Sequence, residues 1–301
     1  MSSSDSEFDV ICYGTISADN IVYVPYVPTP RRDSQVQAEF SRLGGEAATV
    51  ARVLSTWGLR VAVVGNLLGE DRWGDFIRRE LASYSGIDTR YVTSRTDVRT
   101  PFCRIMVTPD GERSILGYWF DETPKTRLDE DIMRRARLLS VDVYGQAERD
   151  EAARLARALG RTVVSADAIW PNYPLAGLSD IIVISRDFLT SYFPGVYIYD
   201  HALELQAVGA GSVVVTHGQK PVLVVDQHGR PSTVEPFPVR AVDTTGAGDV
   251  FKAAVIYGHL QGWDLVRATR FACAASALYV GQPRGVDDVP SLERVRRLAG
   301  G

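Results

Sequence analysis

Short runs of β-branched residues alternate with helical patterns along most of this 301-residue chain. Phe8–Tyr13 and Val61–Val64 are typical of strands, and between them Glu46–Trp57 repeats apolar residues at helical spacing. Later in the chain, Glu148–Leu159 has the pattern of a helix and Thr162–Ala166 that of a strand. Strands that alternate with helices favour a parallel sheet with helices on both faces. We therefore expect an α/β fold with a doubly wound, mostly parallel sheet.

Two segments break this alternation with strand–turn–strand patterns. The first combines Asn20–Val27 with Gln35–Phe40, and the second combines Pro101–Thr108 with Arg113–Trp119. A Pro-Asp-Gly turn joins the strands of the second pair. We expect the two hairpins to form a small β-sheet lid over an active site. The alternative is that they extend an edge of the main sheet.

These patterns divide the chain into an α/β domain and a lid. We assign residues 8–15, 41–98 and 121–301 to the α/β domain, and residues 16–40 and 99–120 to the lid. Residues 1–7, which begin with a serine-rich stretch, are expected to be disordered.

Composition and charge narrow the class of protein. The 33 basic and 37 acidic side chains give a formal net charge of −4, whereas nucleic-acid binders need a positive surface. The longest small and apolar stretch, Phe271–Val280, is much shorter than the roughly 20 residues of a membrane-spanning helix. The N-terminus shows neither the basic start nor the apolar run of a signal peptide. We expect a cytoplasmic protein that has neither nucleic acid nor a membrane as its partner.

The most informative motif is Asp-Thr-Thr-Gly-Ala-Gly-Asp-Val-Phe at Asp243–Phe251. Gly246 and Gly248 allow a ligand to approach the backbone, and the helix that follows presents its positive N-terminal end to an anion. Asp249 adjoins this anion site, where a carboxylate can accept the proton of an attacking hydroxyl. A helix cap is the alternative role for Asp249. The residues alone leave both roles open.

Other nucleotide-binding motifs do not fit the sequence. The chain has no Gly-x-x-x-x-Gly-Lys-Ser/Thr loop and no His-Arg-Asp loop of protein kinases. Phe251 stands where a dinucleotide-binding fingerprint requires Gly or Ala, and the motif lies too far along the chain to open a Rossmann unit. A hydride-transferring enzyme therefore fits poorly.

Asp243–Asp249 resembles the C-terminal signature of the PfkB (ribokinase-like) carbohydrate kinase family. The resemblance covers about residues 8–292, with four further elements in the family's order. These elements are Gly14–Asp19, Gly44–Gly45, Gly65–Gly74 and Thr216–Gly218.

The resemblance implies a ribokinase-like fold, in which a small β-sheet lid covers the doubly wound sheet. It implies ATP-dependent phosphorylation of a hydroxyl group on a sugar or sugar-like small molecule, with Mg²⁺ as cofactor. It also implies a homodimer that forms through the lid. Two alternatives are a nucleoside kinase of the same fold and a nucleotide- or sugar-binding regulatory protein with weakened transfer activity.

The resemblance also assigns roles to individual residues. Asp249 would be the catalytic base, and Gly246, Ala247 and Gly248 would donate backbone N–H groups to the transferring phosphoryl group. The substrate-binding residues would be Asp19, Gly44, Gly45 and Thr49, and the nucleotide-binding residues would be Ser185, Thr216, Gly218 and Thr245. A potassium ion would be held by Asp243, Thr245 and Gly285. The structural alternatives are a strand end for Asp19 and a tight turn for the two glycines.

Three positions depart from the family pattern. Thr49 stands where the family usually has Asn, and Glu46 stands where ribokinase itself is cationic. Ser185-Arg186-Asp187-Phe188 replaces the family's Asn-x-x-Glu element, so an aromatic ring replaces the carboxylate that organises the water ligands of magnesium. We therefore expect Mg²⁺ to enter mainly with ATP and to be held weakly by the protein. Asp187 is the adjacent carboxylate that can compensate through a water molecule.

Overall fold

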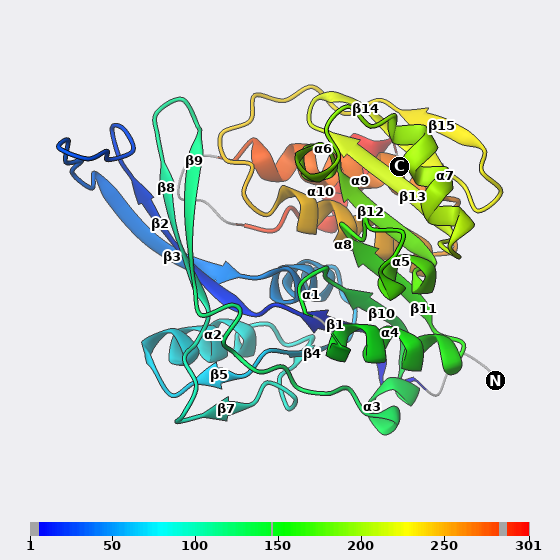
Figure 1. Ribbon diagram of the computed structural model, residues 1–301, viewed down its shortest axis with the longest axis horizontal. Helices are drawn as coiled ribbons and strands as arrows, with labels where there is room; N and C mark the ends of the chain where they lie inside the picture. The colour runs from blue at the N-terminus through cyan, green and yellow to red at the C-terminus, as the bar shows by residue number, and fades with distance from the viewer. Residues whose placement is uncertain (1–5, 146, 283–287, 301) are drawn as a thin grey trace.

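A sheet of nine strands forms the centre of the structure, a computed structural model that describes residues 6–145, 147–282 and 288–300 (Figure 1). The strands from β13 to β6 are parallel, and β14 and β15 add an antiparallel edge. This confirms the predicted mostly parallel sheet. In spatial order the strands are β15 (Pro231–Val234), β14 (Lys220–Val225), β13 (Ser212–His217), β12 (Ile181–Ser185), β11 (Thr162–Ala166), β10 (Ala136–Val141), β1 (Phe8–Gly14), β4 (Val61–Gly65) and β6 (Ile87–Asp88).

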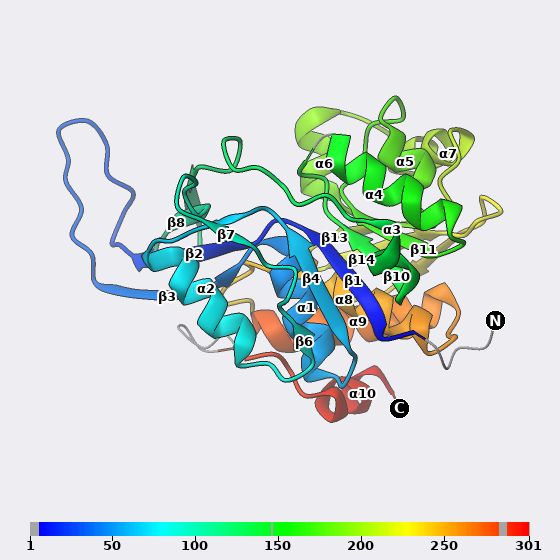
Figure 2. The same ribbon diagram turned by 90° about the horizontal axis from the view of Figure 1, so that it is seen from below.

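Helices cover both faces of this sheet, because successive side chains of a strand point to opposite sides. Val10 and Cys12 of β1 face one apolar core, and Ile11 and Tyr13 face the other. The first core is closed by α1 (Glu46–Thr56), α2 (Arg72–Ala82), α8 (Ala247–Leu260), α9 (Leu265–Val280) and α10 (Leu292–Ala299). The second is closed by α3 (Glu130–Arg134), α4 (Ala147–Ala158), α5 (Pro174–Leu178), α6 (Arg186–Tyr192) and α7 (Ile198–Ala207). Figure 2 shows the two helical layers on either side of the sheet. No described helix has the length and apolar character needed to cross a membrane.

The two predicted hairpins form a separate sheet that projects from the main sheet in Figure 1. Its order is β3 (Ala38–Gly44), β2 (Ser17–Tyr23), β8 (Phe102–Val107) and β9 (Arg113–Tyr118). The alternative of an extended main sheet is therefore wrong. A further two-stranded sheet pairs β5 (Leu68–Gly69) with β7 (Ser94–Arg95).

The first hairpin lies closer to the main sheet than its sequence pattern indicated. The ladder runs from the pair Ser17–Gly44 to the pair Tyr23–Ala38. Prolines at positions 25, 28 and 30 cannot donate to a ladder. The strands therefore pair at the base of the lid, and β3 ends at Gly44 beside the start of α1.

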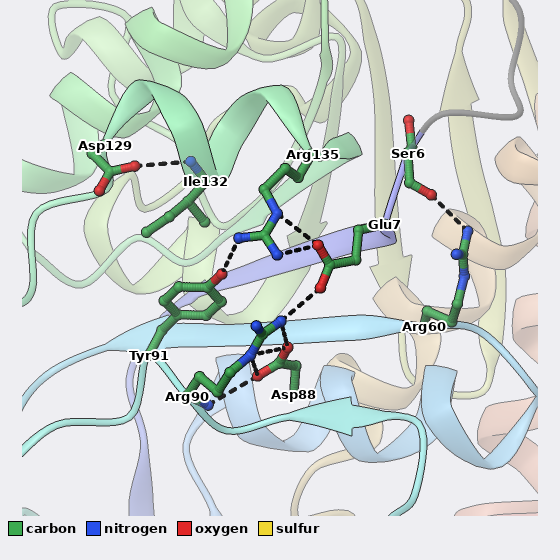
Figure 3. Close-up of polar contacts among 9 residues, drawn as sticks. All are labelled: Ser6, Glu7, Arg60, Asp88, Arg90, Tyr91, Asp129, Ile132 and Arg135. Atoms are coloured by element: carbon green, nitrogen blue, oxygen red, sulfur yellow. Dashed lines mark hydrogen bonds and ion pairs between the residues drawn. The ribbon is translucent and has the colours of Figure 1, made fainter.

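Polar contacts hold the start of β1 at the end of the sheet remote from the lid (Figure 3). The Glu7 carboxylate accepts hydrogen bonds from Arg90 Nη2 at 2.6 Å and Arg135 Nε at 2.6 Å. The Ser6 carbonyl accepts a hydrogen bond from Arg60 Nη2 at 2.9 Å. Ser6 and Glu7 fall within the segment for which disorder was expected, and residues 1–5 of that segment lie outside the described residues.

Candidate active site

The Asp243–Asp249 motif forms the turn that begins α8. Gly246 caps this helix with φ of 81°, a left-handed conformation that favours glycine. A Cβ atom added to Gly248 would meet no atom within 4 Å, so this end of the helix faces open space. The structure thus provides the exposed helix N-terminus that an anion site requires.

Asp249 lies in the first turn of α8, close to several other carboxylates. Burial raises the pKa of Asp249 to about 7; the Lys252 ammonium group lowers it, and the charges of Asp19, Asp167 and Asp142 raise it further. A carboxylate with a pKa near neutrality can accept a proton from a hydroxyl group and release it again. This chemistry goes beyond helix capping.

Asp142, which directly follows β10, is a candidate site residue that sequence reasoning missed. It is 1% exposed, and its Oδ2 accepts a hydrogen bond from the Thr15 amide at 2.6 Å. Among the described residues, no group hydrogen-bonds its buried Oδ1. A Cβ on Gly14 would lie 2.4 Å from the carboxylate, so the absence of a side chain there makes room for it. An unpartnered buried acceptor of this kind is a ready ligand for a substrate hydroxyl.

Asp167, which follows β11, was also missed. Its backbone is left-handed with φ of 48°, a conformation that Asp tolerates better than most residues. Its Oδ1 accepts a hydrogen bond from the Ser185 amide at 2.8 Å, and burial raises its pKa to about 6. Asp142 and Asp167 end neighbouring parallel strands, and this position was the only clue to them in the sequence.

Asp19 and the two glycines meet at the base of the lid. A Cβ on Gly44 would lie 2.3 Å from the Asp19 carboxylate. Gly45 has φ of 84°, and a Cβ there would lie 2.4 Å from the Thr15 carbonyl oxygen. Close approach therefore requires glycine at both positions. Thr49 lies buried in the first turn of α1 that follows.

Arg42 connects this corner to the signature turn. Its Nε lies 3.8 Å from Asp19 Oδ2, and its Nη1 lies 3.6 Å from Asp243 Oδ2. Its Nη2 also donates to the Thr245 carbonyl at 3.3 Å. The guanidinium group thus links strand β3 of the lid to the turn that precedes α8.

The predicted nucleotide-binding residues lie at the carboxyl ends of β12 and β13. Ser185 pairs with Thr216 across the sheet, and the Thr216 hydroxyl donates to the Ile184 carbonyl at 3.3 Å. Gly218 follows in a left-handed conformation, with open space where a side chain would be. Backbone at this edge is therefore accessible to a ligand. Thr245 lies on the signature turn, where Arg42 and Arg113 contact it.

Phe188 cannot serve a metal ion. Its ring packs against Trp170 at 6.0 Å and Tyr192 at 5.1 Å between centroids. Together with Tyr144 and Tyr173, these rings line a cavity of about 650 Å³. The aromatic side chain is thus an integral part of an apolar wall. Within the described residues, no group of three or more His, Cys, Asp or Glu residues has metal-binding geometry.

In the described part of the predicted potassium site, Asp243 and Thr245 contact arginine side chains. Asp243 Oδ1 accepts from the Thr245 amide at 2.8 Å, and the other carboxylate oxygen faces Arg42. Arg113 of the lid donates to the Thr245 hydroxyl at 3.1 Å. Each of the two side chains therefore has an arginine beside it. Gly285, the third predicted ligand, lies outside the described residues.

Comparison with known proteins establishes the family. The model of the pfkB family carbohydrate kinases matches residues 7–292. The chain belongs to this family. It is therefore a kinase that transfers a phosphoryl group from ATP to a hydroxyl group of a sugar or sugar-like small molecule, as the signature predicted.

Individual relatives show how widely the family varies. A 5-dehydro-2-deoxygluconokinase of Clostridium perfringens is 27% identical over 97% of this chain and 93% of its own length. A nucleoside kinase of Methanothermobacter thermautotrophicus is 26% identical over 96% and 95%. The structure of Arabidopsis thaliana ribokinase complexed with ribose and ATP aligns with a TM-score of 0.83 at 23% identity, over 97% of this chain and 98% of that one. This likeness confirms the ribokinase-like fold.

Proposed function

We propose that the acceptor hydroxyl lies against Asp249 and that this carboxylate accepts its proton as the phosphoryl group is transferred. The observation that carries the proposal is the position of Asp249 at the open N-terminal end of α8, with a pKa near neutrality. The amides of Gly246, Ala247 and Gly248 surround the place where the transferring phosphoryl group would lie. Transfer then depends on positioning and electrostatic stabilisation.

The acceptor itself is a molecule rich in hydroxyl groups. Asp19 lies beside Gly44 and Asp142 beside Gly14, and carboxylate oxygens of this kind bind the hydroxyl pairs of a sugar or polyol. Thr49 adds a single hydroxyl. An ATP-consumption screen against sugars, polyols and nucleosides tests this proposal. Turnover of nucleosides alone would favour the nucleoside kinase, and turnover of none would favour a binding protein.

The nucleotide lies along the carboxyl ends of β12 and β13, next to Ser185, Thr216 and Gly218. Mg²⁺ enters with ATP, because Phe188 supplies no ligand. The potassium ion expected at Asp243, Thr245 and Gly285 stays a prediction, in which Asp243 and Thr245 would also contact Arg42 and Arg113.

Asp249→Asn should lower kcat by about 100-fold or more, because the amide cannot accept the proton. The affinity for ATP should change little, since the backbone amides of the turn remain. Steady-state kinetics and nucleotide titration measure the two quantities. Asp200→Asn, which alters an exposed carboxylate on α7, is the matched control. Full activity of Asp249→Asn would reduce Asp249 to a capping role.

Phe188→Glu restores the family's carboxylate and should lower the Mg²⁺ concentration for half-maximal activity at fixed ATP by about tenfold. Phe188→Gln introduces a side chain of nearly the same size as Glu but without its charge, and it should not lower this Mg²⁺ concentration. The measurement is a magnesium titration of each variant. If Phe188→Glu needs as much magnesium as the parent and Asp187→Ala also leaves the magnesium requirement unchanged, the metal is held elsewhere.

We further propose that the protein is a homodimer that forms through the lid. Val36, Ile115 and Leu116 expose apolar side chains there, and β9 is an edge strand with unpaired backbone groups. Ile115→Lys should convert the dimer to a monomer in light scattering after gel filtration. Val266→Lys, at an exposed apolar position on α9, should not. A monomeric parent protein would disprove the proposal.

A further inference from the structure

Lys252 is a buried lysine next to the proposed base. It lies three residues after Asp249 on α8 and is 1% exposed. Its Nζ forms an ion pair with Glu46 Oε1 and donates to the Val141 carbonyl at 2.8 Å. Lysine is almost never buried so deeply unless it is paired. The Glu46 side chain is itself only 11% exposed.

The pair joins the two halves of the site. Glu46 is the first residue of α1, directly after the diglycine turn that adjoins Asp19. Lys252 belongs to the catalytic helix, and Val141 immediately precedes Asp142 at the end of β10. The ammonium group therefore lies where the substrate loop, the catalytic helix and the edge of the sheet meet.

Acidic groups surround this ammonium group. Its charge lowers the pKa of Asp249, Asp142 and Asp167, all of which burial raises. Burial also raises the pKa of Glu46. In a poorly solvated site, one positive charge has a large effect on every carboxylate near it.

The other elements around Asp249 supply few compensating charges. The lid contributes Asp19 with Arg42 beside it, and Lys125 faces Asp142. Two further titratable neighbours among the described residues are neutral near pH 7. These are Tyr144, with a pKa raised to about 12, and Cys12, which adjoins the ion pair and whose pKa is also about 12.

We propose that the Glu46–Lys252 pair sets the charge of Asp249: Lys252 keeps the base ionised, and Glu46 limits the strength of that effect. The proposal rests on the base role of Asp249 given above. Both residues are positioning residues, because they act through Asp249. Their pairing across the site also explains an acidic residue directly after the diglycine turn, where the sequence departs from ribokinase.

The two partners have opposite effects on the pH dependence of activity. The base works only when deprotonated, so kcat/KM rises with pH through the pKa of Asp249. Removal of the ammonium group in Lys252→Met disfavours the carboxylate and should move this rise to higher pH by about one unit or more. Glu46→Gln leaves the ammonium charge uncompensated and should move the rise to lower pH.

The test is the pH profile of kcat/KM at saturating MgATP for both variants. We express the activity at pH 6.5 as a fraction of each enzyme's own plateau. This fraction should be about tenfold lower in Lys252→Met than in the parent, which corresponds to a shift of one pH unit. Lys252→Arg, which keeps the charge, should return the profile toward that of the parent. Glu293→Gln alters an exposed carboxylate on α10 and serves as the matched control.

A purely structural ion pair would lower activity at every pH and leave the midpoint of the profile in place. That result, or shifts of both variants in the same direction, would overturn the proposal. Glu46→Gln is nearly isosteric, so its downward shift tests the proposal even if Lys252→Met does not fold. A failure of the base role itself would be distinguishable, because the rise in activity near pH 7 would then persist in Asp249→Asn.

Discussion

Four carboxylates from separate parts of the chain, Asp19, Asp142, Asp167 and Asp249, meet at the carboxyl edge of the sheet. Burial raises the pKa of Asp142, Asp167 and Asp249, and the charges of the neighbouring carboxylates raise that of Asp249 further. Lys252 is a buried cation at this edge, and its charge lowers the pKa of three of the four carboxylates. The fold gives it two oxygen partners, and both come from elements that also shape the site. The electrostatic balance of the site therefore depends on the packing of α1 against α8.

The lid is tied to this arrangement by arginine. Arg42 faces Asp19 and Asp243, and Arg113 donates to the hydroxyls of Thr244 and Thr245. Both arginines come from strands of the small sheet, β3 and β9, and both reach the turn before α8. The small sheet is therefore linked through two of its strands to the turn that precedes α8.

Local sequence patterns predicted the elements whose residues are buried on both sides. Val61–Val64 is a continuous apolar run because helices cover both faces of its sheet, and such runs are readable without a structure. The signature glycines were equally clear, since a left-handed cap at Gly246 has a recognisable composition. Asp142 and Asp167 were not predicted, because a single Asp after a strand has no local pattern. Only the pairing of β10 with β11 brings them together. Lys252 appeared to be an ordinary helix residue until the fold placed Glu46 beside it.

The ion pair between Glu46 and Lys252 joins an early part of the chain to a late one. The two residues lie 206 positions apart, and α1 packs against α8 in the core on that face of the sheet. During synthesis, α1 and the central strands β1 and β4 emerge long before their covering helices exist. The native core on that face is therefore incomplete until α8 and α9 have been made. The segment that carries α8 and α9 thus supplies both the helices that close this core and the Asp243–Asp249 turn.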